Sequence, residues 1–201
     1  MADEKTHIMA YDPNKKSINQ SRLKNYEMED DWIIKVLSEI KVGHIGTRDS
    51  KQPFVVPSSF WYSKDNHEIY FHSNAYGRMR YNAESNPEAC FECYRSGRLL
   101  PSNLALEASF QYECVIAFGE IRIIKKIDEK RNILNGLLKK YFGEMESGKD
   151  YRPITDDELK RTSVYGIIIN SWSGKRNWNK RAEQAEGGEW PDLDPKWFDF
   201  Y

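Results

Sequence analysis

Two segments of the chain repeat apolar residues at helical spacing. One segment is 29–41, in which Trp32, Ile33, Val36, Leu37 and Ile40 share a face. This period predicts an amphipathic helix, with Asp30 or Asp31 as its cap. The second segment is 127–142, whose apolar face carries Ile133, Leu134, Leu137 and Leu138. It predicts another helix, with Asp128 as the cap.

Between and after these helices the apolar period is that of strands. The predicted strands are 42–47, 53–62, 68–73, 88–95, 110–125 and 163–170. Pro57 interrupts the second strand, which indicates an edge, a bulge or a kink that faces a ligand. Gly119 is the expected bulge of the fifth strand, and 96–109 is expected to be a loop. Short polar turns between the early strands predict a meander.

Two shorter helices complete the expected elements. The first covers about 76–85 and ends before Pro87. The second follows Thr155, because Thr155 and Glu158 have the spacing of a capping box. Strands joined by short turns, with a few peripheral helices, predict a mainly β fold: a small β-barrel with α additions.

Charge and composition narrow the function classes. The chain has 30 basic and 31 acidic residues and a net charge of −1, which disfavours a general nucleic-acid binder. No apolar run approaches the roughly 20 residues that span a bilayer. Residues 1–20 are polar and lack the apolar stretch of a signal peptide, so a cytoplasmic protein without membrane contact is expected.

Three cysteines, Cys90, Cys93 and Cys114, are too few for a disulfide framework. Cys90 and Cys93 have C-x-x-C spacing, but positions three apart on a strand point to opposite faces. With no second C-x-x-C pair, packing as small apolar residues is the favoured interpretation, and no metal site is expected.

The segment 68–80 carries the strongest chemical signal. A strand passes through Ser73 and Asn74 into the start of a helix with Arg78 and Arg80. Free N–H groups at a helix N-terminus attract anions, and a guanidinium can grip a phosphate with two hydrogen bonds. The segment therefore suits a phosphate. The alternative is that Ser73 or Asn74 caps the helix and both arginines are solvated.

His72 ends the strand before this loop. It can bind a ligand, transfer a proton or anchor the helix. No second histidine lies at metal-ligand spacing, so a metal role is not expected.

Five segments in a fixed order resemble a known family. They are 43–46, 53–62, 69–73 with Gly77 and Arg78, 86–91 and 112–119. Over residues 29–180 the chain is similar to the pyridoxamine 5′-phosphate oxidase-like FMN-binding split barrels. Within them it most resembles the nitroimidazole-resistance proteins.

The resemblance implies a six-stranded split barrel and a homodimer with FMN at the subunit interface. It places Val56, Pro57, Ser58 and Ser59 against the flavin ring. It assigns the phosphate and ribityl end to the loop and helix start, that is to His72, Ser73, Asn74, Gly77 and Arg78. The partner subunit is expected to close the site with residues drawn from Glu113, Trp172, Lys175, Arg176 and Trp178.

The resemblance also implies an FMN-dependent oxidoreductase that reduces nitro compounds to amines, with a small-molecule electron acceptor and His72 as the catalytic residue. The alternatives are a non-catalytic flavin-binding or sensing module and a pyridoxamine-phosphate-oxidase-related enzyme with another substrate. A haem-degrading or deazaflavin-using relative also stays open. The expected organisation is a polar arm (1–25), the barrel domain (26–180) and a tryptophan-rich tail (181–201) packed on the barrel or dimer.

Overall fold

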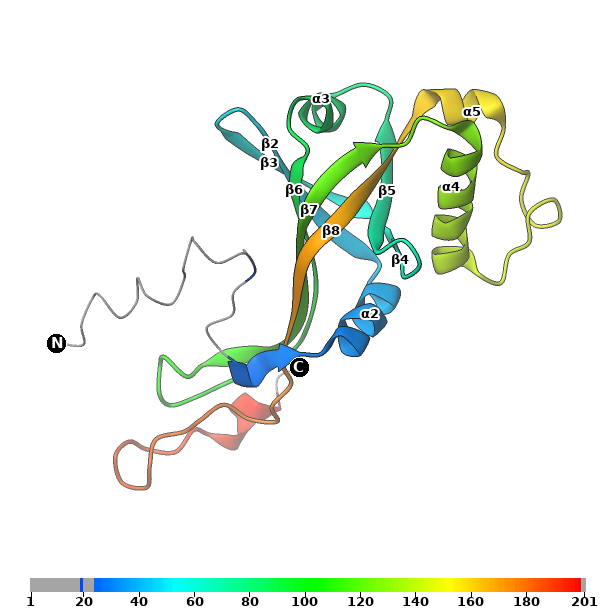
Figure 1. Ribbon diagram of the computed structural model, residues 1–201. Coiled ribbons are helices and arrows are strands. Elements are labelled where there is room, and N and C mark those ends of the chain that lie inside the picture. Colours follow the sequence, from blue (N-terminus) through cyan, green and yellow to red (C-terminus); the bar gives the residue numbers. More distant parts are fainter. Residues whose placement is uncertain (1–18, 20–23, 200–201) are drawn as a thin grey trace.

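The computed structural model describes residue 19 and residues 24–199; most of the predicted N-terminal arm lies outside the described residues. One antiparallel sheet dominates it, with helices at its ends and on one side (Figure 1). The fold is mainly β and is a split barrel, as predicted.

The sheet has eight strands among the described residues. They are β1 (Glu27–Met28), β2 (Val42–Asp49), β3 (Gln52–Ser59), β4 (Trp61–Ser63), β5 (Glu68–Asn74), β6 (Glu88–Leu100), β7 (Ser109–Ile123) and β8 (Thr162–Asn177). The order is β3-β2-β6-β7-β8-β5-β4, and β1 adds to β8. The six predicted strands correspond to β2, β3 with β4, β5, β6, β7 and β8. The count rises to eight because the second strand breaks at Phe60 and because β1 is present.

The sheet curls without closing. β3 and β4 occupy the two ends of the strand order, yet only Phe60 separates them along the chain. β3 is hydrogen-bonded to β2 alone, so Pro57 lies on an edge strand, one of the three predicted alternatives. Its opposite edge faces β5 without a strand ladder, which leaves a split in the barrel wall.

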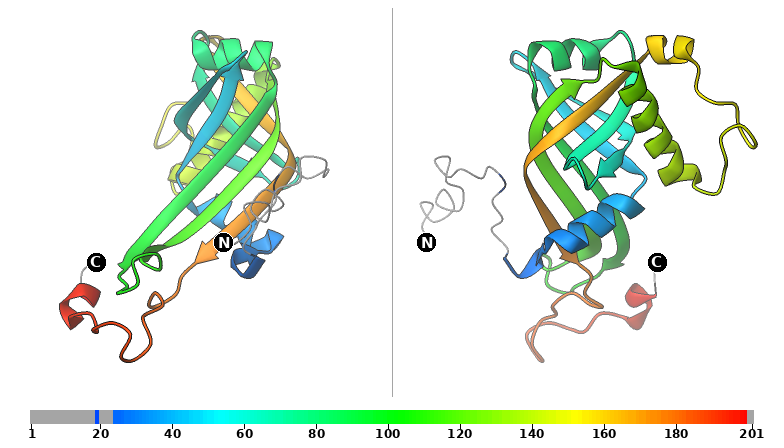
Figure 2. Two further views of the ribbon diagram at one scale, coloured as in Figure 1. Left: turned by 90° about the vertical axis from the view of Figure 1, so that its left-hand side faces the viewer. Right: turned by 45° about the vertical axis from the view of Figure 1, so that its right-hand side comes forward.

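The helices are α2 (Asp30–Glu39), α3 (Arg78–Ser85), α4 (Ile127–Phe142) and α5 (Asp156–Arg161), with short 3₁₀ turns η1 (Lys24–Tyr26) and η2 (Pro195–Phe198). Figure 2 shows α2 beside the lower part of the barrel and α4 beside β5. The barrel core is apolar and includes Ile33 and Leu37 of α2. A smaller cluster on the α4 side joins Tyr70, Ile124, Ile133 and Val164. None of the helices in the described part is long and apolar enough to cross a membrane.

Several predicted element ends are wrong. The N-caps are Glu29 for α2 and Lys126 for α4, and neither helix has a side-chain cap, so Asp30, Asp31 and Asp128 lie inside the first turns. These carboxylates still interact favourably with the positive end of the helix dipole. The predicted capping box of Thr155 and Glu158 is present in full at α5.

Two strands, β6 and β8, run well beyond their predicted ends, and β2 and β5 extend by one or two residues. β6 continues through part of the predicted loop to Leu100, with an irregularity between Ser96 and Leu99. β8 continues past residue 170 to Asn177, because β7 offers it partners along its whole length. Together β6 and β7 form an arm that extends below the barrel (Figure 1).

The C-terminal tail lies against the tip of this arm. Arg98, Ser102 and Gln111 donate hydrogen bonds to backbone carbonyls of Lys180, Glu183 and Asn179. Polar pairing along the hairpin, rather than burial of the tail's tryptophans, holds the tail here: Trp190 and Trp197 stay exposed.

Gly119 permits the closest approach in the sheet. The register shifts between Phe118 and Gly119, as predicted for a bulge, although the extra residue is Asn170 on β8. A Cβ at Gly119 would lie 1.9 Å from the carbonyl oxygen of Ile168, so backbone would have to move to admit it.

We expect Gly119→Ala to lower the free energy of unfolding by about 3 kcal/mol or more, because it overpacks a backbone contact. Urea denaturation measures the change. Gly187→Ala is the control, since a Cβ at that position would have nothing within 4 Å and the change should stay within about 0.5 kcal/mol. Equal midpoints for the two variants would contradict the assigned register.

Candidate functional site

A pocket of about 250 Å³ lies at the split between β3 and β5, beneath the start of α3. Its lining comes from β3 and, after the β4–β5 turn, from the nearly continuous segment that runs from β5 into α3. They contribute Phe54, Val56, Pro57 and Ser58 from β3; Phe71, His72 and Ser73 from β5; and Tyr76, Gly77, Arg78 and Met79 from the loop and α3. The missing β3–β5 ladder is what leaves room for it.

The start of α3 is set by local chemistry. The Asn74 side chain accepts a hydrogen bond from the Tyr76 N–H at 3.1 Å, which turns the chain out of β5. Gly77 is the N-cap residue with a φ of 119°, a conformation that a side chain would strain. No side chain caps the helix, so the N–H groups of its first turn keep their capacity for a ligand.

Arg78 supplies the positive charge at this end of the pocket. Its guanidinium carbon lies 4.9 Å from the centre of the Phe54 ring, an arrangement typical of a cation–π contact. Phe54 thereby steers the exposed arginine toward the pocket rim. Helix N–H groups and a guanidinium together are a combination that suits an anion.

The β3 side of the pocket offers different groups. Val56 and Phe54 pack against the barrel core, so their backbone forms a firm wall. The free edge of β3 presents backbone groups that no neighbouring strand pairs. Pro57 contributes no N–H to this strand. The Ser58 hydroxyl donates to the Ser59 carbonyl at 3.0 Å. This wall suits a planar polar edge more than a charge.

His72 lies between two cavities. It lines the split pocket and also a pocket of about 310 Å³ with Leu134 and Leu137 of α4. On β5, Tyr70 belongs to the cluster on the α4 side, and side chains two apart on a strand share a face. The His72 ring therefore lies on the α4 side. Although part of the His72 side chain is exposed, protein atoms around the ring displace water from it. This loss of hydration disfavours the charged form and lowers the pKa of His72.

Seven of the predicted site residues line the split pocket: Val56, Pro57, Ser58, His72, Ser73, Gly77 and Arg78. Ser59 and Asn74 are adjacent in sequence but outside its lining. Residues assigned to a partner subunit lie elsewhere in this chain. These are Glu113, Trp172, Lys175, Arg176 and Trp178, on β7, on β8 and just after it.

Glu113 has a structural environment of its own. It is 4% exposed and forms ion pairs with Arg95 of β6 and, at 2.9 Å, with Arg176 of β8. The carboxylate therefore ties three neighbouring strands together. Trp172 likewise has a local partner, because its indole N–H donates to Asp30 at 2.8 Å.

Sequence reasoning missed Phe54, Phe71, Tyr76 and Met79 as pocket residues. The sequence could have indicated Phe54, because residues two apart on a strand share a face and Phe54 therefore lies on the same face as Val56 and Ser58. The contribution of Met79 depends on how α3 packs over the barrel, which no local pattern records.

The three cysteines are free. Burial raises the pKa of the Cys93 and Cys114 thiols to about 12. Cys90 and Cys93 point to opposite sides of β6, as predicted for a strand, because Cys93 is buried in the core and Cys90 is half-buried. Thiols with raised pKa values are poor nucleophiles, which favours the packing role.

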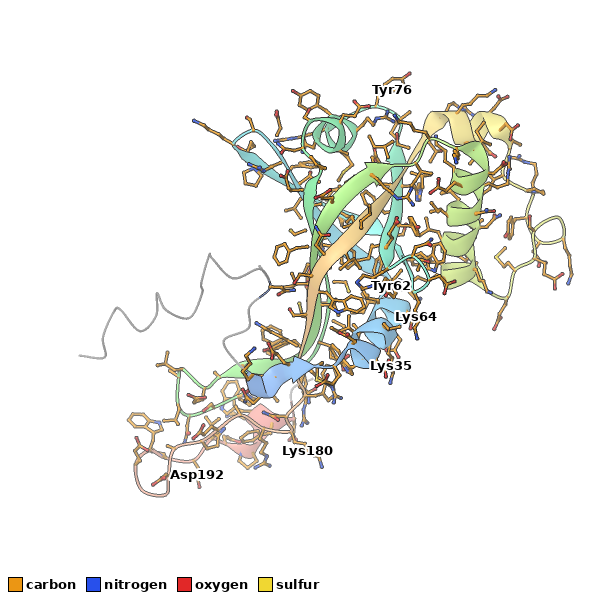
Figure 3. The ribbon with its side chains drawn as sticks, in the orientation of Figure 1. Lys35, Tyr62, Lys64, Tyr76, Lys180 and Asp192 are labelled. Carbon is orange, nitrogen blue, oxygen red and sulfur yellow. The ribbon has the colours of Figure 1, made fainter. Side chains whose placement is uncertain are left out.

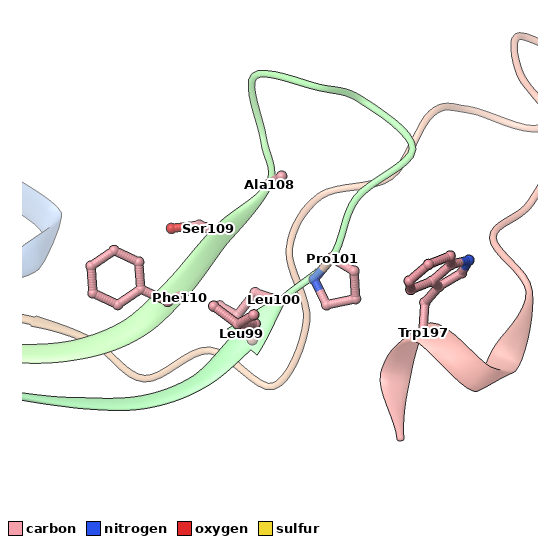
Figure 4. A pocket seen from close by; sticks show the side chains of 7 residues that line it. All are labelled: Leu99, Leu100, Pro101, Ala108, Ser109, Phe110 and Trp197. Carbon is pink, nitrogen blue, oxygen red and sulfur yellow. The ribbon is translucent and has the colours of Figure 1, made fainter. Parts of the chain in front are cut away.

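A larger cavity of about 540 Å³ lies at the other end of the molecule, between the arm and the tail. Figure 4 shows its apolar lining, including Leu99, Leu100, Phe110 and Trp197. It contains no charged side chain. Size alone does not make it the better candidate, because it offers nothing to hold a charged cofactor.

Comparisons with known proteins agree with this architecture. A family model described as pyridoxamine 5′-phosphate oxidase matches residues 29–176. None of the curated proteins compared matches the chain.

Among solved structures, a flavocytochrome from Azotobacter vinelandii is 20% identical, with a TM-score of 0.70 over 88% of this chain and 87% of that one. An FAD and heme binding protein from Mycobacterium smegmatis is also 20% identical, with a TM-score of 0.70 over 81% and 79%. A candidate 5-nitroimidazole antibiotic resistance protein from Bacteroides thetaiotaomicron is 22% identical, with a TM-score of 0.61 over 75% and 86%. At these identities the likeness shows the fold alone.

We expect the His72 imidazole to titrate below its ordinary pKa of 6.5, because desolvation disfavours its charged form. The unfolded chain then binds more protons than the folded one, so stability falls as pH drops from 6.5 to the folded pKa. NMR titration, with the His72 resonance assigned by its loss in His72→Gln, measures the midpoint. A midpoint above 6.5 would mean that a carboxylate, such as Glu158 in the neighbouring pocket, faces the ring.

Proposed function

The chain belongs to the pyridoxamine 5′-phosphate oxidase family, and we propose that it is an FMN-dependent oxidoreductase that reduces nitro compounds. The observation that carries the proposal is the split pocket. It combines an anion-binding end, made by Arg78 and the start of α3, with an apolar wall and a free strand edge on β3. A flavin mononucleotide has this same division into a phosphate, a polyol chain and a planar ring.

Each part of the pocket has a role in this proposal. Arg78 and the first N–H groups of α3 hold the phosphate, and Ser73 bonds the ribityl chain. The edge of β3 at Val56–Ser58 directs backbone groups at the polar edge of the ring. The bound flavin supplies the electron-transfer chemistry, and the protein supplies binding, orientation and electrostatics.

The nitro-compound substrate is the finer part of the proposal. The resemblance to nitroimidazole-resistance proteins supports it, as does the fold likeness to the Bacteroides protein. An external electron donor reduces the flavin in this scheme, and a small nitro compound accepts the electrons. His72 is the residue proposed to handle a proton. Its lowered pKa leaves the ring neutral at neutral pH, so the ring can take up a proton from the donor side and pass it to the substrate as the imidazolium.

One observation favours a second function. The His72 ring lies on the α4 side of β5, and the residue lines both cavities, so the ring is not directed solely at a ligand in the split pocket. A module that binds flavin without catalysis would need nothing from His72. Turnover of His72→Gln separates these functions: a loss of activity with retained flavin supports the enzyme.

A homodimer is the proposed assembly, with FMN at the interface. A pocket of about 250 Å³ is smaller than the roughly 300–1,000 Å³ common for ligand sites, so a flavin would need a further wall. The outer face of β3, β2 and β6 carries exposed Val42, Val55 and Tyr94 on one side of the sheet. An isologous pairing of this face would bury them and bring partner side chains toward the split.

The cytoplasm is the proposed location. Three free cysteines are compatible with a reducing compartment, and reduced electron donors are available there.

If the flavin proposal holds, the protein retains FMN after FMN is added and the sample is desalted, and the bound flavin gives two visible absorbance bands. Arg78→Ala should weaken FMN binding about tenfold or more, because it removes a charge-assisted contact worth roughly 1.5–3 kcal/mol. Fluorescence titration measures the affinity. Lys149→Ala, which removes the same charge in the α4–α5 loop, should bind FMN like the parent protein.

A colourless protein that binds neither FMN nor FAD would overturn the flavin proposal. Retention of haem or FAD instead of FMN would move this chain toward the chemistry named for the Azotobacter and Mycobacterium proteins. Unchanged FMN affinity in Arg78→Ala would remove Arg78 from the site.

The proposed homodimer predicts the mass of the protein in solution. Light scattering should give twice the chain mass of 23.7 kDa. Val55→Glu should shift the protein toward monomer, because a charge replaces a side chain that is 62% exposed in the single chain and buried in the proposed dimer. Phe142→Glu, at the end of α4, is the matched control. A dimer unaffected by Val55→Glu would place the interface on another face.

A further inference from the structure

A further cavity, of about 420 Å³, lies between α2, β4 and α4, and it shares no lining residue with the split pocket. Its apolar part includes Ile34, Leu37 and Trp61, and its charged part is Lys64, Lys139 and Lys140. No aspartate or glutamate lines it. Figure 3 shows Tyr62 and Lys64 on this side of the molecule, with Lys35 of α2 nearby.

Its apolar wall is preformed. The Trp61 ring stacks on Tyr70 with 5.3 Å between ring centres. On α4, a Cβ at Gly136 would lie 2.6 Å from Trp61, so the indole packs closely against the glycine backbone. Held from both sides, Trp61 offers a fixed aromatic wall.

Lys140 places a half-buried ammonium group in this wall. Its Nζ donates to the Leu37 carbonyl at 2.9 Å and lies 3.5 Å from the centre of the Phe60 ring. Loss of hydration lowers the pKa of Lys140 to about 8. The centre of the Tyr141 ring lies farther from this Nζ, at 5.3 Å. The carbonyl and the Phe60 ring take two of the three N–H groups of the ammonium, and the third can serve a ligand.

The positive charges here lack acidic partners. Among the described residues, Lys64, Lys139 and Lys140 form no ion pair with a carboxylate, although ion pairs are frequent elsewhere on this nearly neutral chain. Like charges gathered over a low-dielectric wall raise the local potential, and an anion relieves it. A charged rim above a fixed apolar wall is suited to an amphipathic anion.

We propose that this cavity binds a small aromatic acid, with the ring against Trp61 and Ile34 and the acid group at Lys140. The volume is within the range of small-ligand sites, and the charged groups of the lining are lysines alone. The site is separate from the flavin pocket, so it stands whether or not the chain binds FMN.

Calorimetric titration of the FMN-treated protein tests the proposal with three probes: 2-naphthoate, the neutral 2-naphthylmethanol and acetate. The carboxylate probe should bind at least tenfold more tightly than the other two, because only it satisfies both parts of the cavity. Equal affinity for the acid and the alcohol would overturn the anion site. No heat with 2-naphthoate at millimolar concentration would overturn the site altogether.

Variants locate the binding. Lys140→Met keeps the side-chain length and should weaken 2-naphthoate about tenfold, and Ile34→Trp should block the cavity while every lysine remains. Lys139→Gln, on the exposed rim, should weaken the binding of 2-naphthoate about threefold. This variant replaces Lys140→Met in the test if Lys140→Met does not fold. Lys149→Gln and Arg78→Ala should bind like the parent protein. An equal loss in Lys149→Gln would reduce the effect to surface charge, and a loss in Arg78→Ala would assign the probe to the flavin pocket.

Discussion

Phe60 is the residue on which the open form of this barrel depends. It interrupts the segment from β3 to β4, so the two ends of the strand order meet at one residue outside the ladder. Its N–H donates to the Tyr141 hydroxyl at 2.9 Å, and the same hydroxyl lies 2.9 Å from its carbonyl. Its ring is fully buried against Phe91. Because Tyr141 of α4 satisfies the backbone of the break, β3 can stay paired with β2 while β4 pairs with β5.

The consequence is a wall with a gap in a defined place. β3 and β5 face each other without pairing, and α3 covers the upper end of the gap. Three kinds of polar group lie at the gap. They are the backbone groups on the free edge of β3, the hydroxyl groups of small side chains and the N–H groups at the uncapped start of α3. Their chemistry follows from their position, because groups that the sheet or a cap would otherwise satisfy stay open to a ligand.

One binding cavity is lined by β3, which precedes this break, and the other by β4, which follows it. In the first cavity Arg78 and the start of α3 supply the charge, and in the second cavity Lys140 and its neighbours do. Lys140 also rests on the ring of Phe60. An acid bound at Lys140 would therefore be separated from Phe60 by one side chain, although the two sites share no residue. By contrast, the apolar cavity at the arm has size without charge.

Much of the fold was available from the sequence alone. Apolar spacing predicted α2 and α4, the capping box predicted α5, and strand periods gave the barrel class, because each signal is local in the chain. The turn between Ser73 and Arg78 was also readable, because Asn74 and Gly77 are residue types that favour turns. The lengths of β6 and β8 were not, because only partners on β7 extend them.

The tertiary structure decided the rest. It brought Phe54 and Met79 to the pocket and turned the His72 ring toward α4, because strand pairing and helix packing set those directions. It placed Glu113 between two arginines of its own chain and left three lysines together without an acid. Such groupings join residues tens of positions apart. The sequence does not reveal them, because the charge and burial around a side chain depend on its neighbours in space.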